Sequence, residues 1–173
     1  AVDRGELLHE VADRLKAKTD ELAEVMTLEG GKPLSEISDE VSWTAACFDY
    51  YAEIGRDAVG RVISPVARNQ LNFVIKEPYG VCGLIAPWNY PIQLVLSPLI
   101  GALAAGNCAV LKPSEVSPAS AAMLAKHVPD YLDPECIAVV QGGVDETQAL
   151  LTQRFDYVFY TGGGTVGRIV MEA

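Results

Sequence analysis

Apolar residues in the first third of the chain recur every three or four positions, which is the spacing of one face of an α-helix. One such stripe runs through residues 4–28 among charged residues, and Thr19–Asp20 is a natural point of division into two helices. A second stripe covers Ser35–Ile54, beyond the pair Gly30–Gly31 that closes the first region. The pattern therefore predicts an N-terminal helical region over residues 1–60.

The hydrophobic pattern changes character in residues 61–78. Two short β-prone runs, Arg61–Ile63 and Leu71–Ile75, flank a segment with turn-forming residues, which predicts a β-hairpin. An extended hairpin with few local partners must cover its apolar side with other parts of the structure. This hairpin is also where we place the only boundary between regions of the chain.

From Val81 onward, continuous apolar runs alternate with helix-like segments. Continuous runs, rather than alternating ones, are typical of parallel strands that are buried on both faces. The predicted strands are Val81–Ala86, Cys108–Leu111, Cys136–Val140 and Tyr157–Tyr160, with helices between them and another that starts at Gly164. Repeated strand and helix units predict an α/β fold with a doubly wound, Rossmann-like parallel sheet over residues 79–173.

Two polar residues follow neighbouring strands of this predicted sheet, at the edge where open α/β sheets bind ligands. Asn89 lies in the loop after the first strand, and its amide can donate a hydrogen bond to an oxyanion without titrating. Lys112 ends the second strand and can donate to ribose hydroxyls, which Glu115 can also bind as an acceptor. The alternatives are an Asn that stabilises a turn and a surface Lys–Glu pair of little energetic value.

Glycines cluster between the last predicted strand and the last predicted helix. Residues Gly162–Gly167 match G-x-G-x-x-G, a pattern that is weak by itself, and the acidic residue that would support it falls about 20 positions later, beyond Ala173. Glycines let the backbone approach a ligand closely, and a helix N-terminus supplies free N–H groups for phosphate. The alternative is a tight packing turn without a ligand.

Composition narrows the class of protein. The 13 basic and 23 acidic residues give a net charge of −10, which repels phosphate backbones and makes nucleic acid an unexpected partner. Apolar runs are shorter than a membrane span, and the charged N-terminus lacks a signal-peptide pattern, so we expect a cytoplasmic protein. The four cysteines are far apart, which predicts reduced, buried thiols and no metal site.

The sequence PWNYP at residues 87–91, followed by AAGNCAVLKPSE at residues 104–115, resembles the aldehyde dehydrogenase superfamily. The resemblance implies oxidation of an aldehyde to an acid with NAD or NADP. It assigns Asn89 to the oxyanion of a thiohemiacetal, and the Lys and Glu of KPSE to the adenosine ribose. The cofactor-binding residues that it implies are Ile85, Ala86, Pro87, Trp88, Lys112, Ser114, Glu115, Tyr160, Thr161, Gly162, Gly163, Gly164, Thr165, Val166 and Gly167.

The resemblance also implies features that concern the whole enzyme. In the family, the nucleophilic Cys and the Glu general base come from a later catalytic domain, so we expect this chain to be inactive alone. The hairpin corresponds to the oligomerisation arm, which implies a homodimer or homotetramer. Gly163 stands where the family usually has Ser, a change that affects pyrophosphate contacts. The second half is most similar to the short, class-3-like branch, whereas residues 6–33 look more like the long-form branch.

Two other functions fit the same sequence. One is a non-catalytic dinucleotide-binding or assembly module. The other is an acylating relative, a semialdehyde dehydrogenase that passes its acyl group to coenzyme A. Both share the half-site described above, so the sequence leaves them open.

Overall fold

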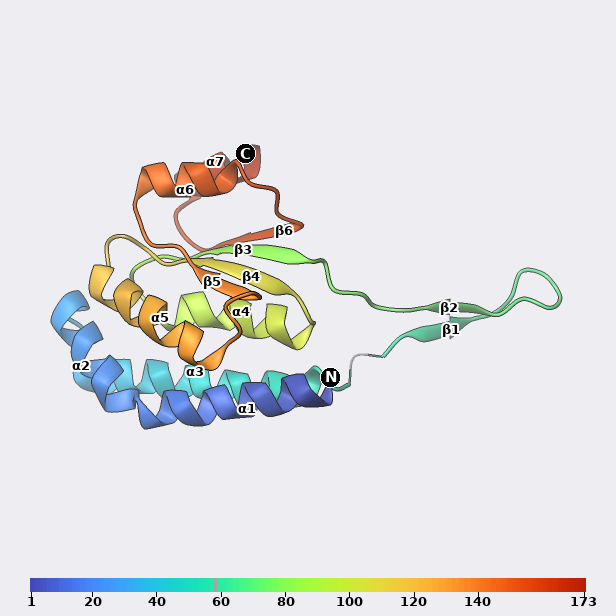
Figure 1. The fold of residues 1–173 in the computed structure, drawn as a ribbon, viewed down its shortest axis with the longest axis horizontal. Helices are drawn as coiled ribbons and strands as arrows, with labels where there is room; N and C mark the ends of the chain where they lie inside the picture. Colours follow the sequence, from blue (N-terminus) through green and yellow to red (C-terminus); the bar gives the residue numbers. More distant parts are fainter. Residues whose placement is uncertain (58) are drawn as a thin grey trace.

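A computed structural model of the protein describes residues 1–57 and 59–173. Three N-terminal helices, α1 (Val2–Ala17), α2 (Thr19–Gly30) and α3 (Leu34–Ile54), form one layer of the molecule (Figure 1). The predicted division between α1 and α2 and the long third helix are confirmed. Ala58 belongs to the predicted region 1–60 but lies outside the described residues.

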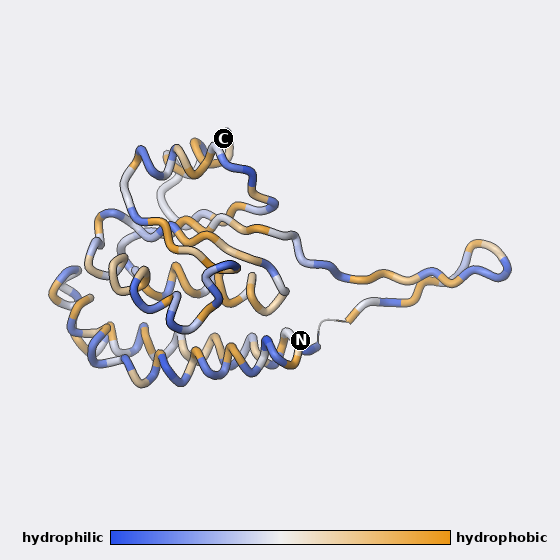
Figure 2. Tube along the Cα trace, in the orientation of Figure 1, coloured by the Kyte–Doolittle hydropathy of each residue, from blue (hydrophilic) through white to orange (hydrophobic). Residues whose placement is uncertain are grey.

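The hairpin extends away from the body as a two-stranded arm (Figure 1). Strand β1 (Arg61–Ile63) pairs antiparallel with β2 (Asn72–Val74), and Val62 lies opposite Phe73. Figure 2 shows apolar residues along both strands of the arm. Val62 is 76% exposed and Phe73 is 60% exposed, so the predicted need for cover from elsewhere holds in this structure.

A four-stranded parallel sheet forms the centre of the molecule. Its strands are β3 (Val81–Ile85), β4 (Cys108–Lys112), β5 (Ile137–Val139) and β6 (Tyr157–Tyr160), in the order β5-β4-β3-β6. Helices α4 (Gln93–Ala104) and α5 (Pro118–Tyr131) cover one face, whereas α6 (Val144–Leu151) and α7 (Gly164–Glu172) lie over the other (Figure 1). The chain thus moves outward from β3 to β5 and then returns to the other side of β3. This confirms the doubly wound, mixed α/β fold.

The main core lies between the sheet and the N-terminal helices. Leu84 of β3 and Leu111 of β4 are buried beside each other in the register of the two strands. They belong to the same hydrophobic cluster as Leu99 of α4 and Phe48 of α3, which have no exposed surface. The N-terminal helices therefore pack on the same core as the sheet.

The prediction of strands buried on both faces was wrong at both edges of the sheet, where most residues of β6 are also exposed. Strand β5 is shorter than Cys136–Val140, and Ala138 in its centre is exposed, because β5 lies at the edge of the sheet. Cys136 lies in the turn before β5 and is also exposed, whereas Cys82 is the buried thiol. All four cysteines are free, as predicted.

Within the described ranges, no helix has both the length and the apolar character that a membrane crossing requires.

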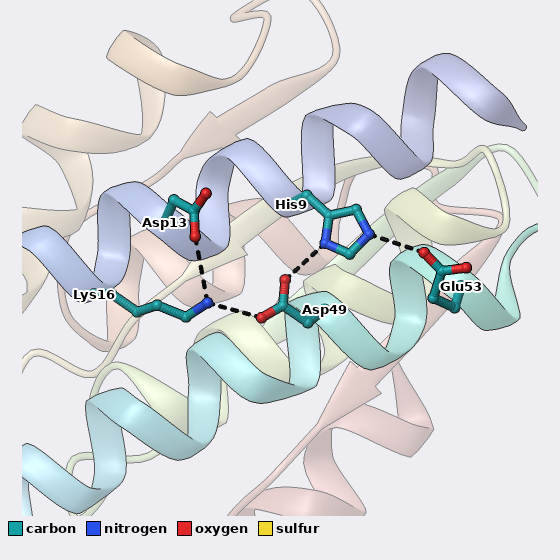
Figure 3. A network of polar contacts seen from close by, with 5 residues as sticks. All are labelled: His9, Asp13, Lys16, Asp49 and Glu53. Atoms are coloured by element: carbon teal, nitrogen blue, oxygen red, sulfur yellow. Dashed lines mark hydrogen bonds and ion pairs between the residues drawn. The ribbon is translucent and has the colours of Figure 1, made fainter.

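A polar network on the surface joins α1 to α3 (Figure 3). The imidazole of His9 lies 2.7 Å from the Asp49 carboxylate and 3.0 Å from that of Glu53. The Lys16 ammonium donates to Asp49 at 2.9 Å and to Asp13 at 3.3 Å. Hydrogen bonds to Asp49 and Glu53 raise the pKa of His9, with a smaller opposing effect of burial.

The pKa of Asp49, the carboxylate at the centre of this network, shifts in the opposite direction to that of His9. Burial acts to raise the pKa of Asp49, but hydrogen bonds from Lys16 and His9 outweigh it, so the pKa is lowered. A raised imidazole pKa and a lowered carboxyl pKa mean that the network favours the charged forms of both groups.

Replacing His9 with Gln is expected to lower the free energy of unfolding more at about pH 5.5 than at about pH 9. The folded pKa of His9 lies above the ordinary value of 6.5, so its contribution is complete below 6.5 and disappears as the pH rises through the folded pKa. The side chain is partly exposed, so the loss at low pH is at most about 1 kcal/mol. Urea unfolding of the wild type and of His9→Gln at both pH values measures this loss of stability. Asp49→Asn removes the partner carboxylate and serves as a second variant. An equal loss at both pH values would contradict this assignment.

Candidate functional site

The carboxyl ends of β3, β4 and β6 open onto one cavity of about 420 Å³. We call this cavity the crevice. Its walls include twelve of the residues predicted to bind a cofactor: Ile85, Ala86, Pro87, Trp88, Lys112, Ser114, Glu115, Tyr160, Thr161, Gly162, Gly163 and Val166. The crevice lies at the point where the chain reverses direction across the sheet, which is where open α/β sheets bind ligands.

Four predicted site residues lie outside the crevice wall. Gly164, Thr165 and Gly167 belong to the first turns of α7 and do not line the cavity. Asn89 is exposed and lines a neighbouring cavity of about 210 Å³ instead. Trp88 lines both cavities, so Asn89 is one residue beyond the crevice along the PWNYP loop.

Lys112 is the buried charge of the crevice. Its side chain is only 2% exposed, and its ammonium donates to the Pro113 carbonyl at 2.8 Å. The carboxylate of Glu115, which is half-exposed, lies 3.8 Å away. An ammonium has three N–H groups, so this geometry leaves donors for a ligand with hydroxyl or carbonyl oxygens. A solvated surface pair does not describe a lysine with this burial.

Burial lowers the pKa of the Lys112 ammonium, while the negative charges of Glu115 and Glu146 oppose that shift. Burying a charge is unfavourable unless it is paired, and here the nearest carboxylate is half in solvent. A lysine held in this way at a ligand-binding edge is a candidate for function.

The glycine turn before α7 combines packing with open backbone. A Cβ atom at Gly162 would lie 2.1 Å from the hydroxyl of Tyr160, and one at Gly167 would lie 3.3 Å from the same ring. These two glycines therefore make room for Tyr160, whose hydroxyl donates to the Gly163 carbonyl at 3.2 Å. The packing alternative thus accounts for Gly162 and Gly167.

Gly163 and Gly164 are different, because a Cβ at either position would have no neighbour within 4 Å. Gly163 is the N-cap residue of α7 and gives the helix no side-chain cap. The first N–H groups of α7 are thus without a side-chain acceptor beside the crevice, which suits an anion. The open space at Gly163 would also accommodate the Ser that the resemblance implies at this position.

Helix α6 contributes a wall that the sequence analysis missed. Its residues Val144, Thr147, Gln148 and Leu151 line the crevice, although none is buried. The Gly142–Gly143 turn could have indicated this wall in the sequence. It follows a predicted strand, so the helix after it begins at the edge of the sheet where the carboxyl ends of the strands lie.

Comparison with known proteins agrees with this architecture. The model of the aldehyde dehydrogenase family matches residues 1–173 of the chain. The chain belongs to this family. Its curated relatives include mouse aldehyde dehydrogenase family 3 member B2, 53% identical over 114 residues, and human family 3 member B1, 58% identical over 101 residues. These alignments cover 63% and 58% of the chain but only 24% and 22% of the relatives, so the chain spans about a quarter of their length.

Solved structures of the family match nearly the whole chain. Staphylococcus aureus AldH in a substrate-bound state has a TM-score of 0.90 and 35% identity, and the match covers 98% of this chain and 38% of that one. An NADP-dependent enzyme of E. coli has a TM-score of 0.91 and 34% identity, with 99% and 36% covered. The S. aureus betaine aldehyde dehydrogenase, solved with NAD+, has a TM-score of 0.91 and 28% identity, with 99% and 35% covered.

None of the cysteines lies at the crevice of this aldehyde dehydrogenase chain. Cys82 and Cys108 are at the amino ends of β3 and β4, opposite the crevice, and Cys47 is inside α3. Burial raises the pKa of both Cys47 and Cys82, which disfavours their thiolates. Across the described parts of the chain, no group of three or more potential metal ligands is gathered either.

The loop that carries Asn89 contacts the partly buried Lys32 and the buried Glu40. Lys32, in the α2–α3 connection, places its ammonium 3.2 Å from the centre of the Tyr90 ring and 3.6 Å from the Glu40 carboxylate. The other Glu40 oxygen accepts the N–H of Gln93, the first residue of α4, at 3.2 Å. We call Lys32, Glu40, Tyr90 and Gln93 the Lys32 clamp. It ties both ends of the loop segment beside Asn89 to the N-terminal helices.

Burial raises the pKa of Glu40, and the hydrogen bond from Gln93 and the charge of Lys32 oppose that shift. Ionising Glu40 therefore costs stability in the folded chain. The cost is absent below the ordinary pKa of 4.5 and grows as the pH rises toward the folded pKa. Lys32 reduces this cost only where Glu40 is ionised.

Replacing Lys32 with Met is expected to lower the free energy of unfolding by roughly 1–3 kcal/mol near neutral pH, because a buried carboxylate loses its cation. The loss should be smaller at about pH 4, where Glu40 is largely protonated. Denaturant unfolding at the two pH values measures it. Lys32→Arg keeps the charge, and Lys16→Met removes an exposed ammonium, so both variants should lose less stability than Lys32→Met. A loss from Lys32→Met that matches Lys16→Met would refute the clamp.

Proposed function

We propose that this chain forms the cofactor-binding half-site of an NAD(P)-dependent aldehyde dehydrogenase. The observation that carries the proposal is the buried Lys112 ammonium, which keeps free N–H donors in the same crevice as the uncapped N-terminus of α7. One group suits ribose hydroxyls and the other suits a pyrophosphate, so the residues present fit a dinucleotide.

The position of each residue in the crevice suggests which part of the dinucleotide it would contact. When bound, the nicotinamide accepts a hydride from the substrate, which is the chemistry that the cofactor supplies. Lys112 and Glu115 hold the sugar by donating and accepting hydrogen bonds, and the open backbone at Gly163 admits the phosphates. The backbone of Ile85, Ala86 and Pro87 borders the path from the sheet toward Trp88.

Asn89 acts outside the dinucleotide crevice in this proposal. Its exposed amide lies beyond Trp88, where it can donate to an oxyanion that develops on the aldehyde carbon. The Lys32 clamp holds the loop, so the amide is positioned before the substrate arrives.

We further propose that the nucleophilic Cys and the Glu general base come from polypeptide beyond the residues described here. The described cysteines are away from the crevice, and the chain spans about a quarter of its curated relatives. The relatives include an NADP-dependent enzyme and a structure with NAD+, so both nicotinamide cofactors stay in the proposal.

Paired variants test the two roles separately in an extended enzyme, meaning residues 1–173 joined to the remaining length of a family 3 relative. Lys112→Ala should weaken dinucleotide binding by roughly 10- to 100-fold, because it removes hydrogen bonds from a charged donor. Asn89→Ala should lower kcat by ~10²–10³ and leave dinucleotide affinity nearly unchanged. Fluorescence titration of the cofactor and steady-state kinetics measure the two effects.

The exposed Lys126 of α5 provides the control, since Lys126→Ala removes a positive charge outside the crevice. The isolated chain serves as the blank and should give no aldehyde-dependent NADH formation. Unchanged cofactor affinity in Lys112→Ala would count against the ribose role, and full turnover in Asn89→Ala would exclude the oxyanion role.

We also propose that the hairpin arm contacts a second copy of the enzyme. Its strands leave Val62 and Phe73 exposed and it stands clear of the body of its own chain (Figures 1 and 2). Covering such apolar surface favours association, by about 1.5–3 kcal/mol for a side chain such as Phe. The expected assembly is a homodimer or homotetramer.

Phe73→Asp is expected to weaken self-association of the extended enzyme by at least about 10-fold, because a carboxylate would have to enter an apolar interface. Phe73→Leu keeps an apolar side chain and should retain the assembly. Sedimentation velocity over a range of concentrations measures both variants. An unchanged assembly in Phe73→Asp would mean that the arm does not hold the subunits together.

A further inference from the structure

Two free cysteines lie side by side at the amino ends of β4 and β5, where the site described above makes no use of them. Cys108 begins β4, and Cys136 is the last residue before β5. The next residues, Ala109 and Ile137, are partners in the parallel register of the two strands. The N–H of Ala109 also donates to the carbonyl of Cys136 at 3.0 Å, so the backbones of both cysteines meet at this hydrogen bond.

Both cysteines are at least partly exposed. Ala109 and Ile137 are each only 1% exposed and point into the core, and successive side chains of a strand point to opposite faces. Cys108 therefore projects away from the core and is partly exposed, and Cys136, in the turn before β5, is exposed. Neighbouring strands are about 4.8 Å apart, which is within the roughly 4.4–6.8 Å between Cα atoms that a disulfide requires.

The pKa of Cys136 also depends on the neighbouring Cys108 thiol. A hydrogen bond to the Cys108 thiol is the main cause that raises the pKa of Cys136, and the acidic side chains of Asp133 and Glu135 in the same turn add to it. A thiol of raised pKa is a thiolate in only a small fraction of molecules at neutral pH, but that thiolate is intrinsically more nucleophilic than one of lower pKa. Cys82, on the neighbouring strand, has a thiol that is buried.

We propose that Cys108 and Cys136 form a dithiol that a small-molecule disulfide, such as oxidised glutathione, converts to an intramolecular disulfide. The accessible Cys136 thiolate attacks one sulfur of the small disulfide, and the first small thiolate leaves. The Cys108 thiolate then attacks the Cys136 sulfur of this mixed disulfide, and the second small thiolate leaves. Two protein thiols are oxidised, one small disulfide is reduced to two thiols, and the two protons remain with the products.

This site is separate from the crevice. The strands run from the cysteines at their amino ends to Lys112 at the opposite edge of the sheet, so the bond would close on the far side of the cofactor site. The bond would connect the edge strand β5 covalently to β4. Reversible disulfides of this kind in intracellular proteins are typically redox-sensing, not structural.

The proposal is tested by incubating the native chain with oxidised glutathione at about pH 8, which is close to the ordinary pKa of a thiol. The products are then mapped by mass spectrometry without reduction. The wild type should give one peptide pair linked through Cys108 and Cys136, with little glutathione retained. Cys108→Ser should stop at the mixed disulfide on Cys136, because the resolving thiol is absent. Cys136→Ser should lose the linked product and most of the reaction.

Cys47→Ser is the matched control and should behave like the wild type, and circular dichroism shows that each variant is folded. A wild type that keeps glutathione on Cys136 would overturn the resolving role of Cys108. Loss of thiols at the same rate in Cys136→Ser would overturn the assignment of the first attack. A wild type whose four thiols all stay reduced would overturn the proposal as a whole.

Discussion

The hydrogen-bonded register of β3 with its two neighbours is the constraint on which the crevice depends. On one side Ile85 lies level with Lys112, and on the other side it lies level with Tyr160. The N–H of Ala86 donates to the Lys112 carbonyl at 3.1 Å, and the N–H of Thr161 donates to the Ile85 carbonyl at 3.0 Å. Three loops that are distant in sequence therefore leave the sheet at the same edge. A shift of one residue in either pairing would turn these side chains to the opposite face of the sheet.

This register also explains how a lysine can be buried at a ligand-binding edge. Leu111 enters the core from β4, so the next residue, Lys112, must face the opposite side of the sheet, where residues of α6 and α7 line the same crevice. Burial lowers its pKa, and its nearest carboxylate is half in solvent. A hydrophobic residue at this position would stabilise the fold more simply, so the buried charge supports the ligand-binding role proposed for Lys112.

The sequence predicted the elements well because each carries its own periodicity, and the strand ends followed from where the apolar runs stop, at Ala86 and just before Lys112. The sequence prediction failed where a position depends on contacts between side chains of different elements. The ring of Tyr160 lies over Gly162, a contact that no spacing encodes. Cys136 is apolar by type, yet it is exposed because β5 is an edge strand, and the order of strands is a tertiary property. The separation of Asn89 from the crevice also depends on how Trp88 packs.

The two halves of the proposed site therefore depend on different parts of the fold. Lys112 is placed by backbone pairing within the sheet, which tolerates changes in surrounding side chains. Asn89 is placed by the Lys32 clamp, in which the α2–α3 connection and α3 hold Tyr90 and Gln93 through side-chain charges. In the proposed function, the N-terminal helices therefore position a site residue in addition to supporting the sheet. Because the clamp contains a buried carboxylate of raised pKa, the contribution of the clamp to stability depends on pH.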